Sequence, residues 1–197
     1  MFLLALLLAL TPPQALDQLK AGNQRFVQNQ PIDPNRSPER RQQVSQGQTP
    51  FATVVGCSDS RVAPELIFDQ GLGDLFIVRV AGNVVGPLEI DSIEYAADVV
   101  RTPLVVVLGH ERCGAVTAVL AGQTKDIEAL AKQIEPAVQE TKGLKKDRLE
   151  QTIKANVGLV VEKLRKNKIL EKWIREKKLE VLGGYYHLGS GEVEWLR

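Results

Sequence analysis

Three continuous apolar runs constrain the fold of this chain more than any other feature. They read ATVVG (52–56), DLFIVRV (74–80) and PLVVVLG (103–109), and they are rich in Val, Ile and Leu. Strands buried on both faces have such runs, whereas a strand with one face in water alternates apolar and polar residues. The runs therefore predict three strands in a sheet that is covered on both sides.

The connections between these runs predict that the strands are parallel. The segment EIDSIEYAADVV (89–100) lies between the second and third runs, and its apolar residues recur at helical spacing: Ile90, Ile93, Ala97 and Val100. Alternation of strand, helix and strand is typical of a parallel sheet with helices packed against it. After Gly114 the chain is expected to be helical to about Lys178.

The two ends of the chain complete the predicted fold. Thr11 is a suitable N-cap and Pro12 suits the first helical position, so a helix is expected to begin there. The last segment, LEVLGGYYHLGSGEVEWL (179–196), predicts two antiparallel strands around a Gly-Ser-Gly turn. We expect an α/β fold with a mainly parallel central sheet flanked by helices, a C-terminal antiparallel strand or hairpin, and an N-terminal helical arm.

Length and charge limit the organisation and the partners. The 197 residues are enough for one well-buried domain, and no linker divides them, so we expect a single domain over residues 11–197. The formal net charge is +1, which argues against nucleic-acid binding through bulk electrostatics.

Residues 1–10, MFLLALLLAL, are all apolar, but a membrane-spanning helix needs about 20 such residues. We therefore expect no stable membrane span. The segment resembles the apolar region of a secretory signal, although no positive charge precedes Lys20. We expect an exported, periplasmic protein; the alternative is a cytoplasmic protein with an apolar N-terminal arm.

Cysteine and histidine follow two of the predicted strands. Cys57 comes after the glycine that ends the first run, and His110 comes after the glycine that ends the third. Open parallel sheets place their sites beyond the carboxyl ends of strands, so these side chains are expected at one edge. Cys113 stands three residues after His110, and two thiolates with one imidazole are a common zinc set. Three protein ligands leave the fourth tetrahedral position open, as in catalytic zinc sites.

Two charged residues beside Cys57 bear on that fourth position. Asp59 could bind zinc directly, but Arg61 can hold the same carboxylate in a bidentate pair. If Arg61 holds Asp59, water takes the fourth position. A disulfide between Cys57 and Cys113 is the alternative for the two cysteines, but it leaves Asp59, Arg61 and His110 without a role.

The motifs CSDSR (57–61) and HERCG (110–114), with FDQGLGDLFIVRVAGN (68–83) between them, resemble those of the β-class carbonic anhydrases. The resemblance extends from about Thr11, through GNQRF (22–26), to the final hairpin, which is all but the first ten residues. It implies reversible hydration of carbon dioxide to bicarbonate by a zinc-hydroxide mechanism. It also implies one Zn²⁺ per chain, and a homodimer or tetramer with active sites near the subunit interfaces.

The resemblance further implies roles for individual residues. Cys57, His110 and Cys113 would hold the zinc, while the Asp59–Arg61 dyad would either release the fourth position to water or let Asp59 close it. By position in the family, Gln48 and Phe76 would contact the substrate. Hydrolysis of carbonyl sulfide or carbon disulfide on the same zinc remains an alternative, as does a non-catalytic protein that binds zinc or bicarbonate.

Overall fold

The computed structural model describes residues 10–196, which form helices around one five-stranded sheet. The strands are β1 (Ala52–Gly56), β2 (Leu75–Arg79), β3 (Leu104–His110), β4 (Glu180–Tyr186) and β5 (Val193–Leu196). The helices are α1 (Pro12–Val27), α2 (Pro38–Val44), α3 (Pro64–Ile67), α4 (Pro87–Glu94), α5 (Gly114–Leu120), α6 (Glu128–Glu140), α7 (Arg148–Arg165) and α8 (Lys168–Arg175). A 3₁₀ turn, η1 (Ala81–Asn83), follows β2, and a π-helical segment, η2 (Tyr95–Val100), continues α4.

The sheet has the order β2-β1-β3-β4-β5, in which only β5 runs antiparallel to its neighbour. The expected α/β class, the parallel strands and the C-terminal antiparallel hairpin are therefore confirmed. β1 coincides with the predicted strand 52–56, and β2 and β3 differ from their predicted ranges by one residue at each end.

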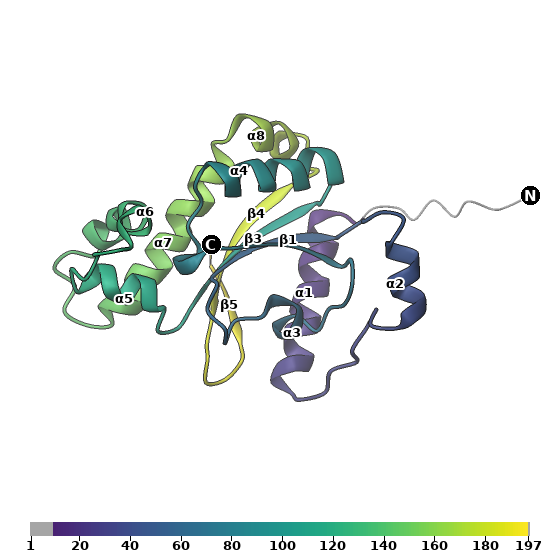
Figure 1. Ribbon diagram of the computed structural model, residues 1–197, viewed down its shortest axis with the longest axis horizontal. Coiled ribbons are helices and arrows are strands. Elements are labelled where there is room, and N and C mark those ends of the chain that lie inside the picture. Colours follow the sequence, from purple (N-terminus) through teal and green to yellow (C-terminus); the bar gives the residue numbers. More distant parts are fainter. Residues whose placement is uncertain (1–9, 197) are drawn as a thin grey trace, which may run out of the picture.

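β1 and β3 are buried on both faces, as their continuous apolar runs predict. β2 has a similar run but lies at the edge of the sheet and is only partly buried, so the same prediction was wrong for residues 74–80. On one face, Val105 and Val107 of β3 pack in the same apolar cluster as Ile93 of α4 and Leu164 of α7. On the other face, Leu104, Val106 and Leu108 pack in a cluster with residues of α1 and α3, among them Leu19 and Ile67. Figure 1 shows α4, α7 and α8 on one side of the strands and α1 and α3 on the other.

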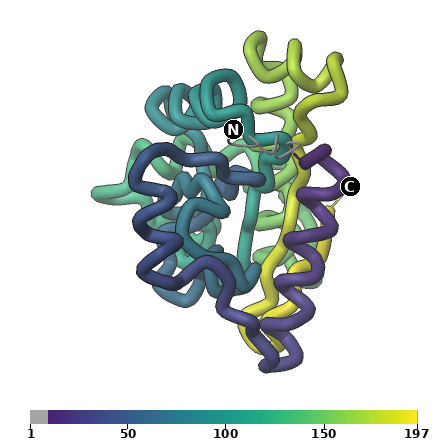
Figure 2. Tube along the Cα trace, turned by 90° about the vertical axis from the view of Figure 1, so that its right-hand side faces the viewer, coloured from purple at the N-terminus to yellow at the C-terminus, as the bar shows by residue number. Residues whose placement is uncertain are grey.

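The N-terminal helical segment lies beside the C-terminal hairpin, as Figure 2 shows for the purple and yellow parts of the chain. Buried Asn23 of α1 donates to the carbonyl of Gly191 at 2.8 Å and accepts from the amide of Val193 at 2.9 Å. Two segments about 170 residues apart in sequence are thus joined by hydrogen bonds that are shielded from water.

The expected helix over 89–100 is only partly regular. α4 ends at Glu94, and η2 carries the wider π-helical turn until Arg101, which adopts a left-handed conformation with φ 70°. The apolar spacing of this segment is compatible with both helix types, so it did not separate them.

Within residues 10–196, no helix has the length and hydropathy that crossing a bilayer requires. The signal-like interpretation of residues 1–10 falls almost wholly outside the described residues, so export stays a prediction.

Candidate metal centre

The parallel register of β1 and β3 brings the predicted ligands to one edge of the sheet. Gly56, the last residue of β1, pairs with Leu108 of β3. Cys57, the residue after β1, therefore lies near the end of β3, where His110 is the last residue. Cys113 precedes α5 and is completely buried, as is His110, while Cys57 is almost completely buried.

Three donor atoms converge at this edge. The sulfur atoms of Cys57 and Cys113 and a ring nitrogen of His110 all lie within 4.8 Å of one another. His110 Nδ1 lies 2.9 Å from the carbonyl oxygen of Glu111, which can only accept, so Nδ1 carries the proton. Nε2 then presents a lone pair, and it has no hydrogen-bond partner among residues 10–196.

These donors fit a zinc ion. A buried ring nitrogen without a partner is costly unless something binds it, and a hydrogen bond from the other nitrogen to a carbonyl is typical of metal-binding histidine. Two thiolates and an imidazole are ligands that zinc prefers, and the two thiolate charges balance that of the dication. Both cysteines are free thiols, so the alternative disulfide is not formed in this structure.

The two thiols are not equivalent. Interaction with the Cys113 side chain lowers the pKa of Cys57, and interaction with Cys57 together with burial raises the pKa of Cys113. The backbone N–H of Gly82 also donates to the Cys57 sulfur, at 3.2 Å. Cys57 is therefore the sulfur on which the surrounding donors stabilise negative charge.

Asp59 and Arg61 form a bidentate pair next to these donors. Arg61 Nε donates to Asp59 Oδ1 at 2.9 Å, and Nη2 donates to Oδ2 at 2.7 Å. The backbone N–H of Arg61 adds a third bond to Oδ1 at 3.0 Å. Asp59 Oδ2 lies 3.8 Å from His110 Nε2, so the carboxylate stands at the edge of the donor cluster.

Hydrogen bonds from Arg61 hold the pKa of Asp59 well below its ordinary value. Because the folded-state pKa is lowered, the ion pair stabilises the folded chain above the ordinary carboxyl pKa. That contribution is lost as the pH falls through the lowered value. Asp59 is therefore ionised at every pH at which the protein is expected to work.

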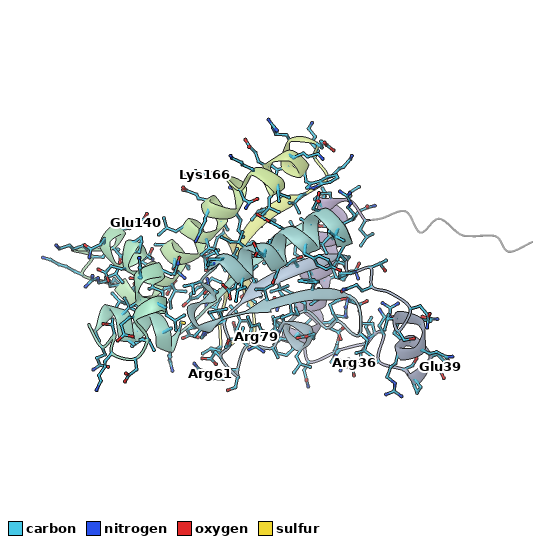
Figure 3. The ribbon with its side chains drawn as sticks, turned by 45° about the horizontal axis from the view of Figure 1, so that its top comes forward. Arg36, Glu39, Arg61, Arg79, Glu140 and Lys166 are labelled. Carbon is cyan, nitrogen blue, oxygen red and sulfur yellow. The ribbon has the colours of Figure 1, made fainter. Side chains whose placement is uncertain are left out.

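Two further residues shape this edge of the sheet, and the sequence analysis did not find them. Arg79, at the end of β2, donates from Nε to the carbonyl of Cys57 at 2.8 Å and from Nη2 to the carbonyl of Asp59 at 2.7 Å. Figure 3 shows Arg61 and Arg79 together on this side of the molecule. Glu111 accepts from the backbone N–H of Leu188 at 3.0 Å, which ties the turn after His110 to the C-terminal hairpin.

A signal for Arg79 exists in the sequence, because it is the one charged residue inside the run LFIVRVA. Arg79 is exposed at the end of β2, a partly buried edge strand, and its guanidinium reaches the carbonyls that follow the neighbouring strand β1.

Gln48 and Phe76 do not reach the donor cluster within one chain. Gln48 is exposed and precedes β1, whereas Cys57 follows β1 at the opposite end. Phe76 pairs with Thr53, near the start of β1, and its ring packs 6.3 Å from that of Tyr95. Their expected contacts with substrate stay predictions.

Comparison with known proteins agrees with this geometry. The family described as carbonic anhydrase matches residues 52–193, well over half of the chain. A carbonic anhydrase of Mycolicibacterium smegmatis is 38% identical over 190 residues, which cover 93% of this chain and 92% of that protein. Carbonic anhydrase 2 of Mycobacterium tuberculosis is 54% identical over 110 residues, 56% of this chain and 53% of its own. Among solved structures, a tetrameric β-carbonic anhydrase of Sordaria macrospora superimposes with a TM-score of 0.70 at 26% identity, covering 81% of this chain and 87% of its own.

We predict that Cys113→Ser lowers zinc affinity by more than about 100-fold, because removal of a ligand costs more than removal of a residue that orients one. Zinc content after equilibration with a competing chelator measures the effect. The control is Ser58→Ala, which changes an exposed neighbour of Cys57 without removing a donor. Equal zinc affinity in Cys113→Ser and the native chain would show that the metal is held elsewhere.

Proposed function

The chain belongs to the β-carbonic anhydrase family, and we propose that it catalyses reversible hydration of carbon dioxide to bicarbonate and a proton on one zinc ion. The observation that carries this proposal is the buried Nε2 of His110. It has no hydrogen-bond partner within residues 10–196 and lies within 4.8 Å of two thiol sulfurs, beside an ionised Asp59. This arrangement supplies three ligands and a charged acceptor close to the fourth position.

The side chains of this site do not supply a strong nucleophile at neutral pH. A bound zinc ion would supply one, because it lowers the pKa of a water from 15.7 toward about 7. Cys57 and Cys113 would balance the charge of the metal. His110 is held in the tautomer that presents Nε2 by its bond to the Glu111 carbonyl. The buried surroundings of all three strengthen these electrostatic interactions by excluding water.

Asp59 would orient the water at the fourth position. A carboxylate has about four lone-pair sites, and Arg61 occupies both on Oδ1 and one on Oδ2. The site that remains on Oδ2 belongs to the oxygen 3.8 Å from His110 Nε2. Asp59 could therefore accept one hydrogen bond from a water at the fourth position, and that bond would orient the water.

Arg61 would decide whether Asp59 acts as an acceptor or as a ligand. Its two side-chain bonds engage both carboxylate oxygens, so Asp59 could move to the metal only by breaking them. We infer that the observed pairing corresponds to the open form of the site, in which the fourth position is left to water.

A second subunit would complete the substrate pocket. β2 is an edge strand, and large apolar side chains on the neighbouring α4 and η2 are exposed, namely Leu88, Tyr95 and Val99. Exposed strand edges and apolar patches are commonly covered by a partner. We propose a homodimer or larger assembly in which Gln48 and Phe76 of one subunit face the metal centre of the other. The tetrameric relative of Sordaria macrospora supports such an assembly.

We predict metal-dependent carbon dioxide hydration with a rate that climbs as the pH rises past neutral. Two thiolates leave less positive charge on zinc than neutral imidazoles would. The pKa of the bound water should therefore be higher than in a site with three histidines. Asp59 stays ionised throughout because its pKa is lowered, so it adds no acid limb above about pH 4. Stopped-flow hydration from about pH 6 to 9, with and without a zinc chelator, measures this. A chelator-insensitive or flat profile would count against the proposal, and faster hydrolysis of carbonyl sulfide or carbon disulfide would reassign the substrate.

We predict that Arg61→Ala keeps one zinc per chain but loses activity by at least about 100-fold, the size of effect seen when one preorganised polar group is removed from an active site. Without the guanidinium, Asp59 is free to occupy the fourth position. Arg112→Ala is the matched control, because Arg112 lies on the same edge, is 78% exposed at its side chain and does not touch Asp59 in this structure. Native hydration rates in Arg61→Ala would exclude the gating role.

We predict that mixed oligomers of Arg61→Ala and Gln48→Ala chains are more active than either variant alone. If Gln48 serves the partner's metal centre, a mixed pair contains one site with both residues native. The measurement is the carbon dioxide hydration rate of each variant alone, of the two variants mixed, and of the two refolded together, all at equal total protein concentration. Recovery is the gain in rate over the variants alone. Lack of recovery in verified mixed oligomers would place Gln48 in the site of its own chain or outside both sites.

A further inference from the structure

The hydrogen bond from Gly82 to the Cys57 sulfur depends on an unusual turn. Gly82 has φ 74° and Asn83 has φ 46°, both in the left-handed region, which glycine and asparagine tolerate best. A Cβ at position 82 would lie 2.9 Å from Ile134 Cδ1 and 3.3 Å from the Ala115 Cβ. The turn thus requires glycine both for its backbone conformation and for the space beside α5 and α6.

Asn156 of α7 holds this turn from the other side. Its Nδ2 donates to the carbonyl of Gly82 at 2.9 Å, and the residue is only 1% exposed. The neighbouring positions on this face of α7, Ile153, Val157 and Val160, are apolar and buried. A polar side chain in such surroundings is costly unless its hydrogen bond is made, so the Gly82 carbonyl is the specific partner of Asn156.

The two hydrogen bonds hold opposite sides of one residue. Asn156 binds the peptide group that follows Gly82, while the N–H that reaches Cys57 belongs to the peptide group that precedes it. Both dihedral angles of Gly82 are therefore restrained, and α7 is linked through Gly82 to the Cys57 sulfur.

We propose that Asn156 is a positioning residue of the metal centre, which keeps the Gly82 N–H directed at Cys57 and so limits the negative charge that this sulfur donates to a bound metal. A hydrogen bond to a metal-bound thiolate draws electron density from the sulfur, and partners of this kind tune a metal site without touching the ion. The inference rests on the proposed zinc site but does not depend on which substrate the site takes.

The test is the absorption spectrum of the cobalt-substituted full chain. Cobalt(II) bound by thiolates shows a sulfur-to-metal charge-transfer band, and a more electron-rich sulfur moves this band to longer wavelength. Asn156→Leu removes the donor and places an apolar side chain of similar size among apolar neighbours. We expect a shift of the band to longer wavelength and a fall in cobalt affinity of about tenfold, the lower end for loss of a residue that orients a ligand.

Asn23→Leu is the matched control. Asn23 is also a buried helical asparagine, 6% exposed, but it belongs to α1, and its Nδ2 donates to the carbonyls of Ile67 in α3 and Gly191 in the hairpin. Both variants are expected to lose stability, and only Asn156→Leu is expected to move the band. Asn156→Ala also removes the donor, and it provides the same test if Asn156→Leu folds poorly.

The outcomes separate this inference from the proposed function. A band at the native wavelength in the Asn156 variants overturns it, as does an equal shift in Asn23→Leu. A shifted band in protein whose native form lacks carbon dioxide hydration supports the role of Asn156 and contradicts the proposed function alone. Absence of any charge-transfer band in the native cobalt-treated chain contradicts both.

Discussion

The parallel pairing of β1 with β3 brings the ligands of the proposed metal site together. It places the residue after Gly56 and the residue after Gly109 at the same edge of the sheet, although they are more than 50 positions apart in sequence. The strands can be held in this register because both their faces are apolar and both are covered by helices. A shift of one residue would exchange the two faces of either strand and move Cys57 away from His110.

Charge balance determines what this edge can do. The two cysteines can supply two negative charges to a dication, and His110 adds a neutral donor. Asp59 is a third negative group within 3.8 Å of His110, and Arg61 compensates it. In the proposed mechanism, the charges that would hold a metal are therefore separate from the charge that would orient its water. Arg79 contributes differently, since it binds the backbone carbonyls of Cys57 and Asp59 and so holds the loop that carries both groups.

Local patterns in the sequence predicted the strands and the donor set well, because each depends on neighbouring residues. Burial of a strand on both faces produces apolar runs such as ATVVG. His110 and Cys113 are only three residues apart, so their spacing can be read directly from the sequence. The bond between Asn156 and Gly82 joins positions 74 apart, and nothing near either residue indicates the other. The same limit applies to Gln48 and Phe76, whose predicted role depends on a second subunit. The change from α4 to the π-helical η2 was also missed, since apolar spacing does not distinguish the two helix types.

Anomalous diffraction at the zinc edge, measured from crystals of the zinc-loaded protein, locates the metal directly. We expect one strong anomalous peak per chain, bound by Cys57, His110 and Cys113, with Asp59 still paired to Arg61. A peak at other residues, or no peak in protein shown to contain zinc, would contradict the metal centre. A peak with Asp59 as the fourth ligand and Arg61 turned away at neutral pH would contradict the open form from which the proposed activity follows.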